Sequence, residues 1–224
     1  ERLDAPELTD RLRRLAEGTG LGIEGVYRIA LSEETRKANA ALTGIGRTRR
    51  VLLGDTLLNG FSAEEIEVVF AHEIGHHVFH HIRRAIVAGG LASLAGFWLA
   101  DRLLALWVAA EGGPARPENM PVWTLPALVL ILGLFSTVLE PLGNALMRRY
   151  ERQSDLYALR RTRLPEAFRS AFLKLARLNK ADTDPPWLEV VLFHSHPPIG
   201  QRLKMAEQAA FDDAPRGDRT VTPN

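Results

Sequence analysis

Two histidines and a glutamate in the run AHEIGHH have the types and spacing of a metal-dependent hydrolytic site. His72 and His76 are four residues apart, so on a helix both imidazoles lie on one face and can reach one ion. Glu73 lies beside them, where its carboxylate can polarise a metal-bound water. Zinc lowers the pKa of such a water to about 7. The segment therefore predicts a catalytic zinc centre; the alternative is a histidine-rich solvated face without metal.

A catalytic zinc usually takes three protein ligands and leaves one position open. Phe79 and Ile82 stand where an H-E-x-x-H-x-x-G-x-x-H motif has its glycine and last histidine, so the third ligand must come from elsewhere. The best candidate is Glu151 in the run RRYERQSDLYAL, with Asp155 one helical turn later on the same face. This spacing suits one carboxylate on zinc and a second that bonds a ligand histidine. Glu140 is a weaker candidate, and the alternative is that both later carboxylates only pair with nearby arginines.

Three further histidines, His77, His80 and His81, extend the cluster. His80 follows His76 by four residues and is a rival ligand on geometry, but we expect it near a membrane surface instead. Gly75 costs about 1 kcal/mol in a helix relative to Ala. Its presence between the two ligand histidines indicates close packing at that point.

A last polar cluster is the run HSHPP followed by Arg202. A histidine and an arginine together can stabilise the oxyanion of a tetrahedral intermediate. The alternative for a His-Pro-Pro loop is a simple entry into a helix.

The N-terminal elements that must support this site begin with an amphipathic helix over residues 6–17. Leu8, Leu12 and Leu15 fall on one face of that helix, and glycines end it. Residues 22–31 read as a short strand.

Residues 39–58 read as a hairpin with a Gly/Arg turn before the apolar run VLL. Ser62 is the expected N-cap of the next helix, and Glu65 three residues on completes a capping box. We expect this helix to continue without a break through Arg84. Residues 212–224 are expected to be a frayed tail.

Two long apolar stretches, residues 85–110 and 121–147, interrupt the polar parts of the chain. Each is long enough to cross a hydrocarbon core, which takes roughly 20 residues. The alternative is two buried core helices or an intramolecular helical hairpin. The weak point of the membrane interpretation is Asp101–Arg102, because a charged pair at membrane depth is costly unless it is paired or near the interface. Three tryptophans suit interfacial positions: Trp98, Trp107 and Trp123.

Arginines flank the two stretches on the side of the candidate site, whereas the connecting loop EGGPARPENM has one arginine against two glutamates. The positive-inside rule then predicts both polar parts in the cytoplasm and the loop outside. The flanking arginines are Arg83, Arg84, Arg148, Arg149 and Arg152.

Composition sets the remaining bounds. The chain has 224 residues, a formal net charge of +1 and no cysteine. Near-neutral charge gives no bulk drive toward nucleic acid, and the lack of cysteine excludes a disulfide scaffold and a cysteine nucleophile. No signal peptide is visible. Because the chain starts at Glu1, we expect a fragment or a processed product.

The chain carries four motifs whose order along the sequence resembles that of a family of integral-membrane zinc endopeptidases. This family includes the CAAX prenyl proteases and the HtpX-type quality-control proteases. The motifs are the strand segment with RRVLLGDTLL, the helix AHEIGHH, the segment ERQSD, and SHPP with its arginine. They span roughly residues 8–205, and RRVLLGDTLL and SHPP look closer to the CAAX branch.

The resemblance implies roles for particular residues. His72, His76 and Glu151 would bind one zinc ion per chain. Glu73 would be the general base and later pass its proton to the leaving amine. Asp155 would orient a zinc-bound histidine.

The resemblance also implies how a peptide is held. His196 and Arg202 would contact the substrate backbone or the oxyanion. The strand near residues 39–44 would be an edge that receives substrate by β-addition, a mode that tolerates varied sequences. The substrate-binding positions would be Asn39, Ala40, Thr43 and Gly44.

The implied fold is mainly α with a small β-sheet (α+β), a zincin-like catalytic domain of the gluzincin type. Residues 1–84 and 148–211 would form the peptidase domain, and residues 85–147 would be two transmembrane helices in the lipid bilayer. CAAX proteases carry several further transmembrane helices before the catalytic region, and this sequence lacks them. We therefore expect either the catalytic part of a longer protein or a minimal relative.

The predicted function is that of a membrane-anchored zinc metalloendopeptidase of CAAX-protease type. The expected substrate is a peptide or protein, and candidate substrates include prenylated and membrane-embedded proteins. One alternative keeps the chemistry and changes the role to quality control of damaged proteins. A second alternative is an inactive membrane scaffold that binds peptides, and a third is a protein that stores or senses zinc.

Overall fold

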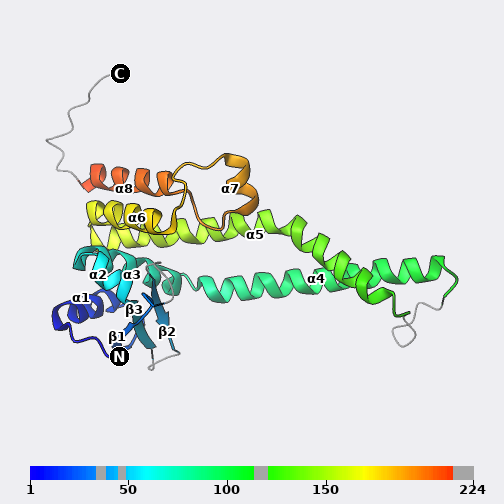
Figure 1. Cartoon of the computed structure of the whole chain (residues 1–224), viewed down its shortest axis with the longest axis horizontal. Helices are drawn as coiled ribbons and strands as arrows, with labels where there is room; N and C mark the ends of the chain where they lie inside the picture. The colour runs from blue at the N-terminus through cyan, green and yellow to red at the C-terminus, as the bar shows by residue number, and fades with distance from the viewer. Residues whose placement is uncertain (34–38, 45–48, 114–120, 214–224) are drawn as a thin grey trace, which may run out of the picture.

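The computed structural model describes residues 1–33, 39–44, 49–113 and 121–213. Most of these residues are helical, with one three-stranded sheet. Figure 1 shows the sheet and most of the helices gathered at one end, from which two long helices, α4 and α5, extend side by side. The α+β class expected from the sequence is confirmed.

The N-terminal helix α1 (Pro6–Ala16) and the strand β1 (Ile23–Ile29) form where the sequence predicts them. Proline at the first position of α1 suits the start of a helix, where its missing N–H is not needed. The predicted apolar face is buried: Leu8, Leu12 and Leu15 all join the core.

Strands β2 (Ala40–Thr43) and β3 (Arg49–Gly54) pair in antiparallel fashion, as the predicted hairpin requires. Residues 45–48 of its predicted Gly/Arg turn lie outside the described residues. β1 pairs with β3 in parallel, and the order β1-β3-β2 leaves β2 at one edge. The prediction of a strand as far as residue 58 is wrong, because residues 55–60 form the short helix α2 (Asp55–Gly60). The Asp55 carboxylate accepts hydrogen bonds from the Thr56 backbone and from the segment after β1, which turns the chain here.

The helix α3 (Ala63–Val78) carries the histidine motif and begins with the predicted capping box. The Glu65 N–H donates to Ser62 Oγ at 3.2 Å, and the Ser62 N–H donates to the Glu65 carboxylate at 2.6 Å. The prediction of an unbroken helix through Arg84 is wrong. α3 ends at Val78, and a new helix begins three residues later. The break lies at His80, whose backbone is left-handed with φ 54°.

The two long helices are α4 (His81–Ala110) and α5 (Thr124–Thr162), each long and apolar enough to cross a membrane. Their apolar side chains face outward; Leu94 is 69% exposed and Val138 75%. The alternative of two buried core helices is therefore not what the chain forms. In α4, Arg102 donates to the adjacent Asp101 carboxylate, and such pairing lowers the cost of these charges at membrane depth.

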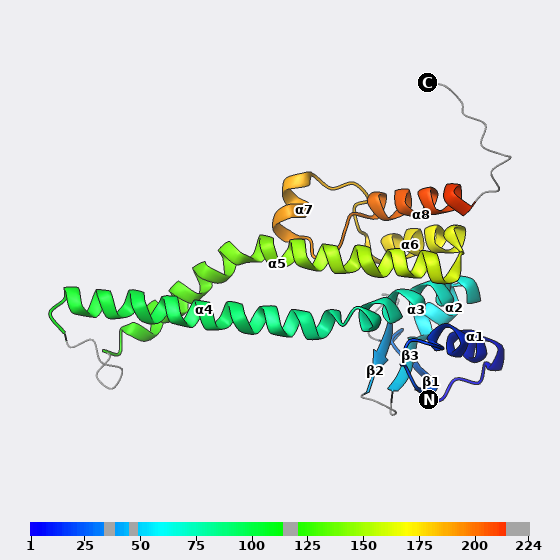
Figure 2. The same ribbon diagram turned by 180° about the vertical axis from the view of Figure 1, so that it is seen from behind.

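The C-terminal part consists of the polar end of α5 and three helices, α6 (Pro165–Asn179), α7 (Trp187–Phe193) and α8 (Ile199–Asp213). Pro141 lies inside α5, which bends along its length (Figure 2). Proline removes one backbone hydrogen bond and clashes with the preceding turn, so it accounts for a bend. α8 continues through Asp213, and the rest of the expected tail lies outside the described residues.

Candidate active site

The site forms where α3 crosses α5. A Cβ built on Gly75 would lie 2.9 Å from the Ser154 Cα, closer than real Cβ atoms approach backbone. The close packing that the sequence indicates at this glycine is therefore confirmed. Absence of a side chain lets α5 lie directly against the turn of α3 that carries His72 and His76.

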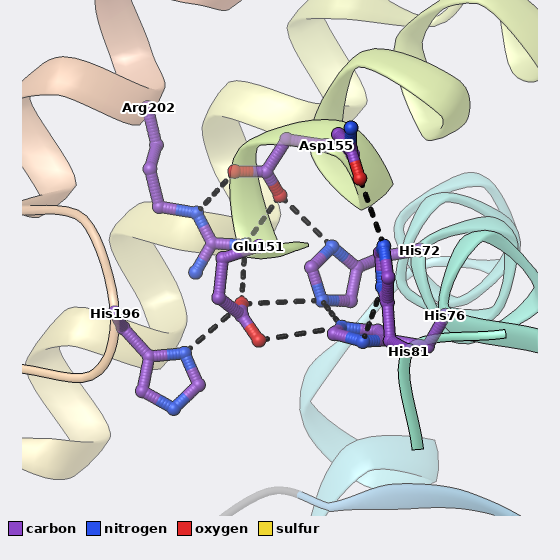
Figure 3. A network of polar contacts seen from close by, with 8 residues as sticks. His72, His76, His81, Glu151, Asp155, His196 and Arg202 are labelled. Atoms are coloured by element: carbon purple, nitrogen blue, oxygen red, sulfur yellow. Dashed lines mark hydrogen bonds and ion pairs between the residues drawn. The ribbon is translucent and has the colours of Figure 1, made fainter. Parts of the chain in front are cut away.

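This crossing brings His72, His76 and Glu151 together, and Figure 3 shows their side chains pointing at one another. The two Nε2 atoms of the histidines lie 3.1 Å apart. The Glu151 Oε2 atom is 3.4 Å from His72 Nε2, and Oε1 is 3.3 Å from His76 Nε2. Among the described residues, these three side chains are the group arranged to hold a metal ion.

The donor set fits zinc. Ligand atoms about 2.1 Å from one tetrahedral zinc are about 3.4 Å apart, and the three separations lie close to that value. Two imidazole nitrogens and one carboxylate are also a ligand set of catalytic zinc sites, which keep a fourth position for water or substrate.

His72 has a second partner on its other ring nitrogen. Its Nδ1 lies 2.9 Å from Asp155 Oδ1, so Asp155 holds the ring while Nε2 faces Glu151. Burial by itself lowers the pKa of His72, but hydrogen bonds to Asp155 and Glu151 outweigh burial and raise it to about 9. A carboxylate on the outer nitrogen makes an imidazole a stronger ligand and fixes its orientation.

Arg202 is buried and holds Asp155 in turn. Its Nε donates to Asp155 Oδ2 at 2.8 Å, and its Nη2 donates to the other oxygen of the same carboxylate. The guanidinium also lies over the Phe172 ring, 3.8 Å from the centroid. Nη2 is 3.7 Å from a Glu151 oxygen. This placement favours a role in fixing the two carboxylates over direct contact with an oxyanion.

Glu73 lines a cavity of about 310 Å³ beside the metal group, together with His76. Burial raises the pKa of the Glu73 carboxyl, and the neighbouring histidines act in the opposite direction. The same cavity is lined by Leu42 and Gly44, so the end of the edge strand β2 opens onto it.

His196 reaches the site from the loop between α7 and α8. Its Nδ1 lies 2.9 Å from Glu151 Oε2, while 64% of its side chain stays exposed. Two residues of α5 hold α7 and the start of this loop. Arg148 donates to the carbonyl oxygens of Val190 and His194, and Asn144 donates to that of Leu192.

The other histidines and the rival carboxylate Glu140 are not part of the group of His72, His76 and Glu151. His80 is exposed at the break after α3. His77 lies 3.3 Å from an Arg49 guanidinium nitrogen. Glu140 lines a groove between α4 and α5 with Ser93. The sequence does not reveal the role of His81, which is buried and hydrogen-bonded to His76. Nothing local in the sequence marks the helix break that turns this side chain inward.

A helix carrying H-E-x-x-H, with a glutamate from a later helix completing the metal group, defines a metallopeptidase of gluzincin type. A model of peptidase family M48 matches residues 2–210, and the chain belongs to this family. The resemblance to both CAAX prenyl proteases and HtpX-type proteases is confirmed by individual relatives.

A Bacillus subtilis protein named Uncharacterized metalloprotease YhfN is 34% identical over 203 residues, which cover 90% of this chain and 48% of that protein. CAAX prenyl protease 1 of Saccharomyces cerevisiae is 27% identical over 223 residues, covering 90% of this chain and 48% of that enzyme. A Protease HtpX homolog of Listeria monocytogenes is 28% identical over 228 residues, covering 91% and 73%.

The crystal structure of S. mikatae Ste24p has the same fold. It matches with a TM-score of 0.78 at 24% identity, covering 92% of this chain and 51% of that one. The chain thus spans about half the length of that structure and of the yeast and Bacillus relatives.

Proposed function

We propose that the protein is a membrane-anchored zinc metalloendopeptidase similar to the CAAX prenyl proteases. The observation that carries the proposal is the triangle of His72, His76 and Glu151 ligand atoms with Glu73 beside it. When bound there, zinc supplies Lewis acidity, which acidifies water and polarises a carbonyl oxygen. His72, His76 and Glu151 would hold it.

The protein's own groups perform the remaining steps. Glu73 takes a proton from the attacking water and passes it to the leaving amine, a task suited to a carboxylate whose pKa burial raises. His196 is exposed at the mouth of the site and is the side chain placed to donate to the oxyanion. Asp155 and Arg202 keep His72 and Glu151 in position.

The peptide substrate adds as a further strand along β2. This strand pairs with β3 on one side, and its end borders the cavity that contains Glu73. Backbone hydrogen bonds from residues 39–44 would align the peptide without reading its sequence. The predicted substrate-binding positions Asn39, Ala40, Thr43 and Gly44 lie along this edge. The Asn39 carbonyl already accepts a hydrogen bond from the Gly54 N–H at 2.9 Å, and backbone groups alternate in direction along a strand. Ala40, rather than Asn39 or Thr43, therefore presents its backbone groups to the open edge, and Gly44 lines the cavity at its end.

The segments before residue 84 and after residue 148 form one peptidase domain, which the apolar parts of α4 and α5 anchor in a bilayer. The outward-facing apolar side chains of both helices support this arrangement. Arginines at the peptidase ends of both helices favour a cytoplasmic site.

A quality-control role similar to that of HtpX-type proteases is the second candidate, favoured by the HtpX homolog of which this chain covers 73%. A cleavage assay in detergent with zinc separates the two. A prenylated CAAX peptide is compared with the same peptide unprenylated and with an unfolded protein. Preference for the prenylated peptide supports CAAX-type processing, and cutting of the unfolded protein without such preference supports quality control. If no substrate is cut by zinc-loaded protein, the proposed peptidase activity is wrong for this chain.

A further inference from the structure

A buried histidine outside the metal group contacts one of the proposed ligands. His81, the first residue of α4, is only 2% exposed, and its Nδ1 lies 3.1 Å from His76 Nδ1. Its Nε2 lies 3.0 Å from the side-chain oxygen of Gln153 on α5. His76 uses its other nitrogen, Nε2, to face His72 and Glu151.

The break between α3 and α4 is what brings His81 to His76. In a continuous helix, residues five apart point in directions about 140° apart, because each residue turns the helix by about 100°. Here Phe79 leaves the helix and His80 takes a left-handed backbone with φ 54°. That conformation costs roughly 1–2 kcal/mol for a residue with a Cβ. The strained turn therefore brings His81, the first residue of α4, into contact with His76 in the last turn of α3.

Aromatic neighbours fix the orientation of the His81 ring. It stacks on Tyr150 with 4.3 Å between centroids and 12° between planes. It is also within 24° of parallel to the Phe79 ring, at 5.6 Å. These contacts come from the end of α3 and from α5, and they hold the His81 ring against His76 (Figure 3). The same orientation places Nε2 at the Gln153 side-chain oxygen.

We propose that His81 is a positioning residue that fixes His76 in the tautomer able to bind the metal. The Gln153 side-chain oxygen is an acceptor, so His81 Nε2 carries a proton and donates it. His81 Nδ1 then has a lone pair and accepts from His76 Nδ1–H. His76 Nε2 is left with its lone pair directed at the metal group. This inference rests on the proposed zinc site.

If the hydrogen bonds between Gln153, His81 and His76 ran in the opposite direction, His76 could not bind the metal. If Gln153 presented its NH₂ group instead, His81 Nε2 would accept and its Nδ1–H would donate to His76 Nδ1. The proton of neutral His76 would then lie on Nε2, where it would block the metal. The two ligand histidines thus have different outer partners: the carboxylate Asp155 on His72 and the neutral relay of His81 and Gln153 on His76.

The test uses the full chain and measures zinc affinity by chelator competition. His81→Phe keeps an aromatic ring against Tyr150 and removes the acceptor. It should weaken zinc binding roughly 10-fold or more, the usual effect of losing an outer partner of a ligand. His81→Asn can still present an acceptor to His76 and should recover part of that loss. His80→Asn, one residue away on an exposed side chain, should bind zinc as the unmodified protein does.

A second measurement reads the tautomers directly. In zinc-loaded protein labelled with ¹⁵N-histidine, the ring-nitrogen resonances should show His81 protonated at Nε2 alone and His76 protonated at Nδ1. Protonation of His81 at Nδ1, or His81→Phe binding zinc within about two-fold of the unmodified protein, would overturn the inference. If the unmodified protein binds no zinc, the proposed function fails instead. Should His81→Phe not fold, the ¹⁵N measurement on the unmodified protein still decides.

Discussion

At the scale of residues, each proposed ligand histidine has a partner on the nitrogen that faces away from the metal group. Asp155 holds the His72 ring by a hydrogen bond, and Arg202 holds the Asp155 carboxylate in turn. The side chains around the metal group are therefore fixed by two successive sets of partners. Glu151 receives contacts from both histidines and from His196. This placement supports the proposal that Glu151 is the third ligand and not a partner for surface arginines.

The identity of the third ligand can be tested by removing each candidate carboxylate. We expect Glu151→Ala to lose most bound zinc after dialysis against a weak chelator, because it removes one of three ligands. Glu140→Ala is the matched control, since Glu140 is exposed between α4 and α5 and should leave about one zinc per chain. Metal analysis of both variants gives the answer. The reverse order of zinc loss would place the third ligand elsewhere.

Asp55 predicts a pH dependence of stability. The Ser32 hydroxyl and the Leu31, Ser32 and Thr56 amides donate to its carboxylate, which lowers its pKa to about 2. The unfolded value is about 3.9. Because the folded pKa is the lower one, ionised Asp55 stabilises the fold above about pH 4, and this contribution disappears as pH falls toward 2.

We therefore expect Asp55→Asn to lower the unfolding temperature by several degrees at pH 7. The difference from the unmodified protein should shrink steadily between about pH 4 and pH 2. Thermal unfolding across this range, with exposed Asp10→Asn as a control, measures it. A difference that is the same at pH 7 and pH 2 would contradict the role of the ionised carboxylate.

At the scale of elements, the crossing of α3 and α5 determines whether the site assembles. The two helices meet at Gly75, directly before His76, and at Ser154, three residues after Glu151. Any displacement of α5 moves Glu151 and Asp155 together. The tight contact is with backbone, which cannot be relieved by rotating a side chain.

Gly75→Ala should destabilise the protein by about 1–3 kcal/mol and reduce zinc affinity, because the added methyl group pushes α5 away from α3. Gly89→Ala is the control, since a Cβ there meets nothing within 4 Å. Within α4 it should be neutral or slightly stabilising. Chemical unfolding and zinc competition on both variants test the contrast. Equal behaviour of the two variants would show that the crossing tolerates separation.

How much of these elements could be predicted depends on whether their cause is local. The capping box at Ser62 and the apolar face of α1 are local patterns, and the sequence predicts both. The end of α3 at Val78 is not predicted, because HHVFHHIRR suits a continuous helix and no residue in it marks a left-handed turn at His80. The contacts that His81 makes after this turn, with Tyr150 and Gln153 of α5, are tertiary. The same holds for Arg202, whose partner Asp155 lies 47 residues away.

At the scale of the whole molecule, the peptidase part is assembled from two segments separated by a helical pair. α3 from the first segment packs against α5 and α6 from the second, while the apolar ends of α4 and α5 project away from them (Figure 1). Trp107 and Trp123 contact each other near the far end of the pair, with ring centroids 5.0 Å apart. This shape is consistent with a peptidase held at one face of a bilayer.

Single-cysteine labelling tests the proposed orientation, because these 224 residues contain no cysteine of their own. A cysteine at Glu111, at the far end of α4, should react with a membrane-impermeant thiol reagent in intact cells. A cysteine at exposed Arg169 in α6 should react only after the cells are opened. The opposite pattern would reverse the topology, and equal labelling of both sites would argue against a membrane-spanning pair.

The central claim is that this chain hydrolyses peptide bonds with one bound zinc and Glu73 as the base. The most direct test measures zinc content and peptide turnover together for the unmodified protein and for Glu73→Gln. We predict about one zinc per chain in both proteins, with turnover reduced at least 100-fold in the variant, since general-base catalysis contributes roughly 10²–10⁴-fold. Unmodified protein without zinc, or a Glu73→Gln variant that retains full turnover, would contradict the account.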